Sequence, residues 1–160
     1  LWIAGDCEHE AFRSWADIAT VYKQPTQDDL TCNNLASIDL GGIDLGVRMA
    51  IAVKSALTRG RIPILIGVDL PDLDVPYLVD CLQHLESHDL VISPAEDGGY
   101  GLLGMKQFYH KLFENKAWGT DSVFAETQRD IQGLEISAKY LPQVWDVDEP
   151  EDVARWLTEQ

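Results

Sequence analysis

The stretch LVISPAEDGGYGLLG, residues 90–104, decides how the chain is expected to fold. Two apolar runs, Leu90–Ile92 and Gly101–Met105, predict two buried strands, because short apolar runs bounded by turn residues are typical of strands in a sheet interior. Between them, Glu96 and Asp97 are followed by two glycines. Such a turn is either an ordinary hairpin connection or a place where a ligand approaches the backbone closely.

Further strands and helices are predicted on both sides of this stretch. Apolar residues at helical spacing and suitable capping residues predict a helix from Asp44 to Gly60 and another that begins at Asp74. The other predicted helices cover residues 8–19, 108–113, 121–131 and 150–158, and the other predicted strands cover residues 62–68, 134–140 and 144–147. Residues 23–43 are predicted as loop, with a strand near residues 35–38. We therefore expect one α/β domain over the whole chain, with a mostly parallel, mixed sheet covered by helices on both faces.

Two of these elements carry finer expectations. Residues 62–68 form an apolar run broken only by Pro63, which suits a strand buried on both faces. The helix that begins at Asp74 holds Pro76 in its first turn, where proline is favoured. Its inner face is predicted to consist of Leu78, Cys81, Leu82 and Leu85.

The composition excludes several classes of partner. Acidic residues outnumber basic residues 27 to 12, and a surface of this charge repels nucleic acids and anionic membranes, so that a phosphorylated substrate would need a local cation. Three widely spaced cysteines without a CxxC pattern predict a reducing, cytoplasmic environment. No apolar run approaches the ~20 residues that a bilayer requires, and there is no signal peptide. The chain begins with residues typical of the middle of a strand, so we expect it to be truncated at the N-terminus.

Acidic side chains follow several predicted strands at the point where each strand ends. Ligands of open α/β sheets bind beyond the carboxyl ends of the strands. Carboxylates that converge there repel one another unless a cation lies among them, and Mg²⁺ prefers carboxylate and phosphate oxygens. The residues at these places are Asp69, Asp97, Asp146 and Asp148.

The alternative is that each of these aspartates is an ordinary turn or cap residue. Asp148 with Glu151 can form a capping box for the last helix, which would explain Asp148 completely. Asp146 would then point to the opposite side of the strand end.

Two features with basic side chains also allow a binding role and an ordinary structural one. Arg48 lies about one turn into its helix, where the helix dipole disfavours a cation, so it is a candidate to contact an anion. The alternative is a surface arginine that reaches back to Asp44 or Asp39. His84 and His88 have a spacing that can bind zinc, but they lack a third ligand and are predicted to be exposed. The sequence contains no P-loop, nucleophile elbow or dinucleotide-binding glycine motif.

Five segments in order carry a resemblance to a known family: DLGVRM at 44–49, IGVDLPDL at 66–73, SPAEDGGYGLLGM at 93–105, LFENKAWGTDSVF at 112–124 and WDVDEPEDVARWL at 145–157. The chain resembles a bacterial family of glycosyltransferase-A-like proteins, the nucleotide-diphospho-sugar transferases. More distantly, it is similar to the nucleotidyltransferases that make molybdopterin-guanine dinucleotide and to the phospholactate guanylyltransferases.

The resemblance implies a three-layer α/β/α fold that lacks its first strand, together with roles for particular residues. The metal, Mg²⁺ or Mn²⁺, would be held by Asp69 and Asp148, and the catalytic side chains would be Asp97 and Glu96. The residues expected to contact substrate are Arg48, Gly98, Gly99, Trp118 and Thr120, with Thr120 also capping a helix.

The function predicted on this basis is a metal-dependent transferase that acts on a nucleotide-sugar or a nucleotide. One alternative is a nucleotidyltransferase. Members of the family begin with a strand and a basic, glycine-bearing loop that holds the nucleotide, and this chain starts after that loop. A second alternative is therefore a catalytically inactive member that acts as a binding module, or as a homodimer that covers an open sheet edge.

Overall fold

The computed structural model describes residues 2–3, 22–23 and 45–158. The chain divides into two compact units, residues 1–48 and residues 49–160. In the first unit, strands β1 (Trp2–Ile3) and β2 (Tyr22–Lys23) pair in parallel. The helix predicted for residues 8–19 and the loop and strand predicted between residues 24 and 43 lie outside the described residues.

The second unit contains a mixed four-stranded sheet with the order β3-β5-β4-β6. Its strands are β3 (Ile64–Ile66), β4 (Leu90–Pro94), β5 (Tyr100–Met105) and β6 (Ala138–Tyr140). Strand β5 runs antiparallel to both of its neighbours, whereas β4 and β6 are parallel. The predicted mixed α/β sheet is thus confirmed, but the expectation that it is mostly parallel is wrong for the strand pairings. Strands β3, β4 and β6 share one direction, and the hairpin strand β5 lies between β3 and β4 and makes two of the three pairings antiparallel.

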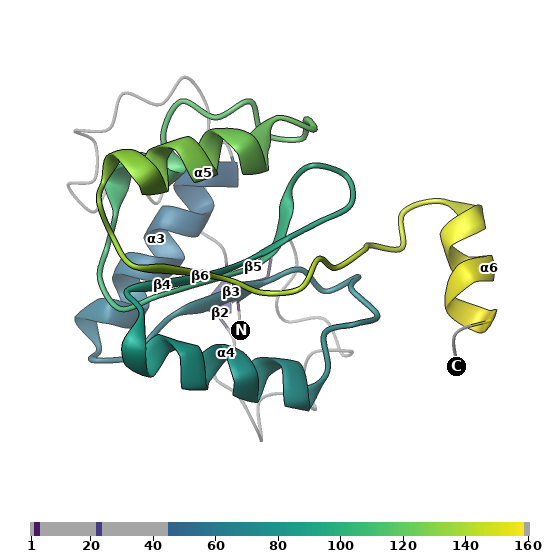
Figure 1. The fold of residues 1–160 in the computed structure, drawn as a ribbon, viewed down its shortest axis with the longest axis horizontal. Helices are drawn as coiled ribbons and strands as arrows, with labels where there is room; N and C mark the ends of the chain where they lie inside the picture. The colour runs from purple at the N-terminus through teal and green to yellow at the C-terminus, as the bar shows by residue number, and fades with distance from the viewer. Residues whose placement is uncertain (1, 4–21, 24–44, 159–160) are drawn as a thin grey trace. The chain divides into compact units, whose positions relative to one another are not determined.

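Helices cover both faces of this sheet, as Figure 1 shows for α4 below it and for α5 and the part of α3 from residue 49 onward above it. In the part of the chain that the structure describes, the helices are α3 (Leu45–Thr58), α4 (Val75–Ser87), α5 (Val123–Gly133) and α6 (Pro150–Thr158), with a 3-10 turn, η1, at His110–Phe113. As predicted, Asp74 caps α4: its carboxylate accepts a hydrogen bond of 2.8 Å from the Tyr77 amide. Within the described residues, no helix is both long enough and apolar enough to cross a bilayer.

The core is divided by the sheet because successive side chains of a strand point to opposite faces. Leu90 and Ile92 of β4 pack with Ala50 and Val53 of α3 on one face. Val91, between them in sequence, packs with Cys81, Leu85 and other apolar side chains on the face covered by α4. The stretch that decides the fold therefore supplies both halves of the core.

Two expectations about burial are wrong. The run 62–68 forms only the short strand β3 at the edge of the described sheet, where Ile62, Ile66 and Val68 are 52%, 47% and 92% exposed. An apolar run cannot by itself distinguish an edge strand from a central one. Leu82, predicted on the inner face of α4, is 49% exposed, while Cys81 and Leu85 carry the packing.

Candidate functional site

The acidic residues that follow the strands gather at one edge of the sheet. Because β3, β4 and β6 share a direction, their carboxyl ends reach the same edge. Asp69 comes after β3 and Asp97 after β4. Asp146 and Asp148 lie on the segment that continues from β6.

Backbone hydrogen bonds fix these segments side by side. The Val144 amide donates to the Pro94 carbonyl over 2.9 Å, and the Glu96 amide donates to the Val144 carbonyl over 3.0 Å. On the other side, the Val147 amide donates to the Asp69 carbonyl over 3.0 Å. Residues 144–147 therefore run between the turn that carries Asp97 and the loop that carries Asp69.

Asp146 lies at the centre of this acidic edge. Partial burial raises the pKa of its carboxyl above the ordinary value, and the charges of Asp97, Asp148 and Asp69 raise it further. The sequence analysis singled out Asp146 without giving it a role, and the direction expected for its side chain stays a prediction. We name Asp69, Asp97, Asp146 and Asp148 together the acidic rim.

The capping box predicted between Asp148 and Glu151 is absent. Instead, the Asp152 carboxylate accepts hydrogen bonds from the backbone amides of Glu149, at 2.9 Å, and Asp148, at 3.2 Å. These two amides lie just before α6, so Asp152, in the first turn, reaches back to the backbone that leads into the helix. The exposed carboxylate of Asp148 is not used in this cap.

The acidic rim suits a hard cation that keeps part of its own solvent shell. Within the described residues, no three side chains of His, Cys, Asp or Glu converge into a complete metal cage. Mg²⁺ does not need one, because it commonly takes one or two carboxylates and completes its octahedron with water and substrate phosphate. The oxygen donors present fit that mode of binding.

The turn between β4 and β5 is explained largely by contacts within the chain. One oxygen of Asp97 accepts a 2.8 Å hydrogen bond from the Gly99 amide, which fixes the direction of the carboxylate. Gly98 has a φ of 87°, and a Cβ there would lie 2.2 Å from the Asp121 carbonyl oxygen. Gly98 is therefore required for close packing against Asp121, and ligand contacts of Gly98 and Gly99 stay a prediction.

Glu96 is held by an arginine from the last helix. The two Nη atoms of Arg155 lie 2.8 and 3.2 Å from the two carboxylate oxygens of Glu96. These hydrogen bonds lower the pKa of Glu96, which keeps it ionised at neutral pH. An ionised carboxylate that is paired with an arginine is poorly suited to exchange protons, and the catalytic roles expected for Glu96 and Asp97 stay predictions.

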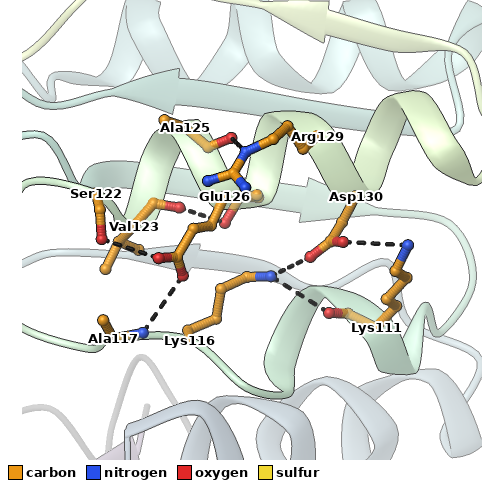
Figure 2. A network of polar contacts seen from close by, with 10 residues as sticks. Lys111, Lys116, Ala117, Ser122, Val123, Ala125, Glu126, Arg129 and Asp130 are labelled. Carbon is orange, nitrogen blue, oxygen red and sulfur yellow. Dashed lines mark hydrogen bonds and ion pairs between the residues drawn. The ribbon is translucent and has the colours of Figure 1, made fainter.

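The segment with Trp118 and Thr120 is attached to α5 by a network of polar contacts, shown in Figure 2. Lys116, whose side chain is 2% exposed, forms an ion pair with Asp130. One oxygen of Glu126 accepts a 3.3 Å hydrogen bond from the Ala117 amide, and the other accepts a 2.9 Å bond from the Ser122 hydroxyl. The network holds residues 116–122 in place on both sides of Trp118.

Trp118 and Thr120 have defined surroundings within the second unit. The Trp118 ring contacts Tyr100 edge to face, with 6.5 Å between ring centroids. The Thr120 hydroxyl donates to the Ala117 carbonyl over 2.7 Å. Helix α5 begins with Ser122 at the capping position, so Thr120 is not its cap. Contacts of Trp118 and Thr120 with substrate stay a prediction.

The remaining candidates lie elsewhere in the chain. Arg48 is half-buried in the first turn of α3, in the first unit, and its contact with an anion stays a prediction. His84 lies 3.6 Å from Asp80, and the His88 ring nitrogen lies 3.0 Å from the His84 carbonyl. The histidines thus have local partners on α4.

Comparisons with known proteins gave a match to a family model and a similar crystal structure. Residues 1–120 match the model of a family described as an uncharacterised protein conserved in bacteria, DUF2064. A crystal structure from Desulfovibrio desulfuricans G20, named as a candidate nucleotide-diphospho-sugar transferase, is similar with a TM-score of 0.73 and 29% identity. The similarity covers 92% of this chain and 60% of that chain, so this chain spans less than two thirds of the relative. A search of the curated proteins gave no match.

Proposed function

This chain belongs to the bacterial DUF2064 family, and on that premise we propose that it is a metal-dependent transferase acting on a nucleotide-sugar or a nucleotide. The name of the similar structure from Desulfovibrio desulfuricans G20 supports this class of reaction. We also assign the chain to the three-layer glycosyltransferase-A fold. The mixed sheet with helices on both faces supports that assignment.

One observation carries the proposal. The backbone bonds from Val147 to Asp69 and from Glu96 to Val144 bring acidic segments from three strand ends to one edge. A nucleotide diphosphate is itself an anion, and it would be repelled by the acidic rim alone. A divalent cation between the two removes this conflict, because it attracts both.

The residues of the rim take separate roles. Asp69 and Asp148 would hold Mg²⁺ or Mn²⁺, which when bound supplies positive charge to the diphosphate leaving group. Asp97, oriented by the Gly99 amide, faces the same edge and would accept the proton of an acceptor hydroxyl. Asp146 adds negative charge that strengthens cation binding at the rim.

The first experiment measures thermal unfolding with Mn²⁺ and with UDP-, GDP- or CTP-type ligands, separately and together. We expect stabilisation that needs both metal and nucleotide, amounting to about 2.7 kcal/mol when the ligand is at a hundred times its Kd. Asp69→Asn and Asp148→Asn should abolish it. Asp80→Asn, the same change on the exposed surface of α4, should leave it intact.

The outcomes separate the candidate functions. Stabilisation by a nucleotide-sugar supports the glycosyltransferase, whereas stabilisation by a nucleoside triphosphate favours nucleotidyl transfer. Nucleotide binding without turnover in a product assay would indicate a binding module. Absence of any metal-dependent shift in the wild-type protein would overturn the proposal.

A further inference from the structure

We propose that Arg155 is a positioning residue, which clamps the Asp97 turn to the Asp146 segment and so sets the spacing of the acidic rim. Its partners are Glu96 and Trp145, and we call these three residues the Arg155 clamp. The inference deepens the proposed function and rests on it for the rim's role as a metal site. The clamp itself is tested below by a measurement that needs no metal.

The first half of the clamp is the contact with Glu96. The guanidinium meets the carboxylate with both Nη atoms, at 2.8 and 3.2 Å. A bidentate pair of this kind fixes orientation as well as distance, because both groups are planar. Glu96 directly precedes Asp97, so holding its side chain restrains the turn that presents Asp97.

The second half is the contact with Trp145. The central guanidinium carbon of Arg155 lies 4.0 Å from the centroid of the indole ring, a distance typical of cation–π contact. Trp145 is 3% exposed, so its ring is itself fixed by packing. It directly precedes Asp146, and one guanidinium is therefore shared between the residues before two members of the rim.

The Arg155 clamp opposes a repulsion between carboxylates of the acidic rim. The charge of Asp97 raises the pKa of Asp146, so the two ionised carboxylates repel each other across neighbouring segments. Helix α6 has no buried side chain, so it is not held by a packed core of its own. The contacts of Arg155 attach α6 to both segments and oppose the repulsion.

An ordinary surface ion pair would contribute little, since Arg155 and Glu96 are 39% and 50% exposed. The sign of the effect on metal affinity distinguishes the two roles. Arg155→Gln removes a positive charge near a cation site, which by electrostatics alone strengthens Mn²⁺ binding. Loss of positioning weakens Mn²⁺ binding, because the segments that carry the rim carboxylates are then no longer held at a fixed distance from each other.

The experiment therefore compares Mn²⁺ affinity and amide hydrogen exchange in the wild type, Arg155→Gln and Arg155→Lys. For Arg155→Gln we expect Mn²⁺ affinity to fall by about tenfold, the size typical when a residue that orients metal ligands is lost. Arg155→Lys should show a smaller loss, because an ammonium cannot bond both carboxylate oxygens in the same plane. Arg61→Gln, the same charge change at the amino end of β3, should leave the affinity unchanged.

Hydrogen exchange tests the clamp without metal. The amides of Glu96 and Val147 bond Val144 and Asp69, respectively, so they report directly on the spacing of the segments. We expect both to exchange faster in Arg155→Gln while the amides of β5 keep their rates. Unchanged exchange together with unchanged or stronger Mn²⁺ binding would overturn the clamp. If the wild type binds no Mn²⁺, the proposed function fails, and faster exchange in the variant still supports the clamp.

Discussion

In two acidic regions of the second unit, the pKa of a central aspartate is shifted in opposite directions. Beside α5, Asp130 is bonded by Lys116 and Lys111, and these contacts lower the pKa of its carboxyl although burial alone would raise it. At the rim, burial and three neighbouring carboxylates raise the pKa of Asp146. The fold supplies lysines to the first region, whereas at the rim the charges that act on Asp146 are those of other carboxylates.

The difference separates charges that stabilise the fold from charges that, in the proposed function, bind a cation. The paired region, which consists of Asp130, Lys111 and Lys116, connects residues 116–122 to α5. Its charges are neutralised by side chains of the protein itself. The rim has no comparable lysine among the causes that shift Asp146, and its repulsion decreases when a cation binds. Changes in the two regions should therefore affect stability with opposite signs.

The largest expected effect comes from breaking the paired region. Lys116→Met leaves Asp130, whose side chain is 19% exposed, with only the more exposed Lys111. We expect the free energy of unfolding to fall by about 3 kcal/mol, because a largely buried carboxylate loses its buried partner and keeps only an exposed one. Urea unfolding at pH 7 measures it.

Lys111→Met is the matched control for this change. Its side chain is 55% exposed, and a loss of less than about 1 kcal/mol is expected. The pH dependence gives a second check. A depressed pKa contributes stability that is present above the ordinary carboxyl pKa and lost as pH falls through the folded value. Lys116→Met should reduce this acid-dependent loss, and an equal effect of both lysine variants would contradict the comparison.

A smaller effect is expected where the two regions meet. Gly98 follows Asp97 of the rim and packs against Asp121, at the end of the segment held by α5. Gly98→Ala adds a Cβ at positive φ against a backbone oxygen, and we expect a loss of about 2–3 kcal/mol. Gly99→Ala is the control, because its Cβ would meet only the Asp97 side chain, at 3.1 Å. Equal losses in thermal melts of the two variants would show that the Asp121 contact is unimportant.

Local patterns in the sequence were sufficient for most elements of the second unit. Helical spacing and capping residues placed α3, α4 and α6, and apolar runs placed β4 and β5. The edge position of β3 was not predictable, because pairing between distant strands decides it. The convergence of acidic residues followed from a general rule about strand ends, so the rim could be expected before its contacts were known.

The contacts that could not be predicted from the sequence depend on the directions of individual side chains. Glu151 and Asp152 are adjacent acids, and only the geometry at the start of α6 shows that Asp152 is the one that bonds the amides preceding the helix. Arg155 bonds a residue 59 positions away, and no local pattern signals that contact. The available signal was the position of Arg155 within a segment that resembles a known family. That signal does not identify the residue that Arg155 contacts.

The smallest expected effect has the opposite sign and lies at the rim. Asp146→Asn removes the carboxyl whose pKa is raised by burial and by its neighbours. For an acid with a raised pKa, stability is lost as pH rises from the ordinary carboxyl range through the folded pKa, because ionisation costs more in the folded state. Without metal at pH 7, we therefore expect Asp146→Asn to gain about 0.5 kcal/mol, a value kept small by solvent screening.

Metal makes the rim prediction decisive. With saturating Mg²⁺ the wild type should regain the difference, because the cation relieves the repulsion that Asp146→Asn removes by mutation. The two proteins should then be equally stable, or the wild type more so, in thermal unfolding at pH 7. At pH 3.5, where the carboxyl is largely protonated in both the folded and the unfolded state, the gain in the variant should disappear even without metal. A variant that is less stable than the wild type at pH 7 without metal would show that Asp146 is a structural residue, and the contrast with Asp130 would then fail.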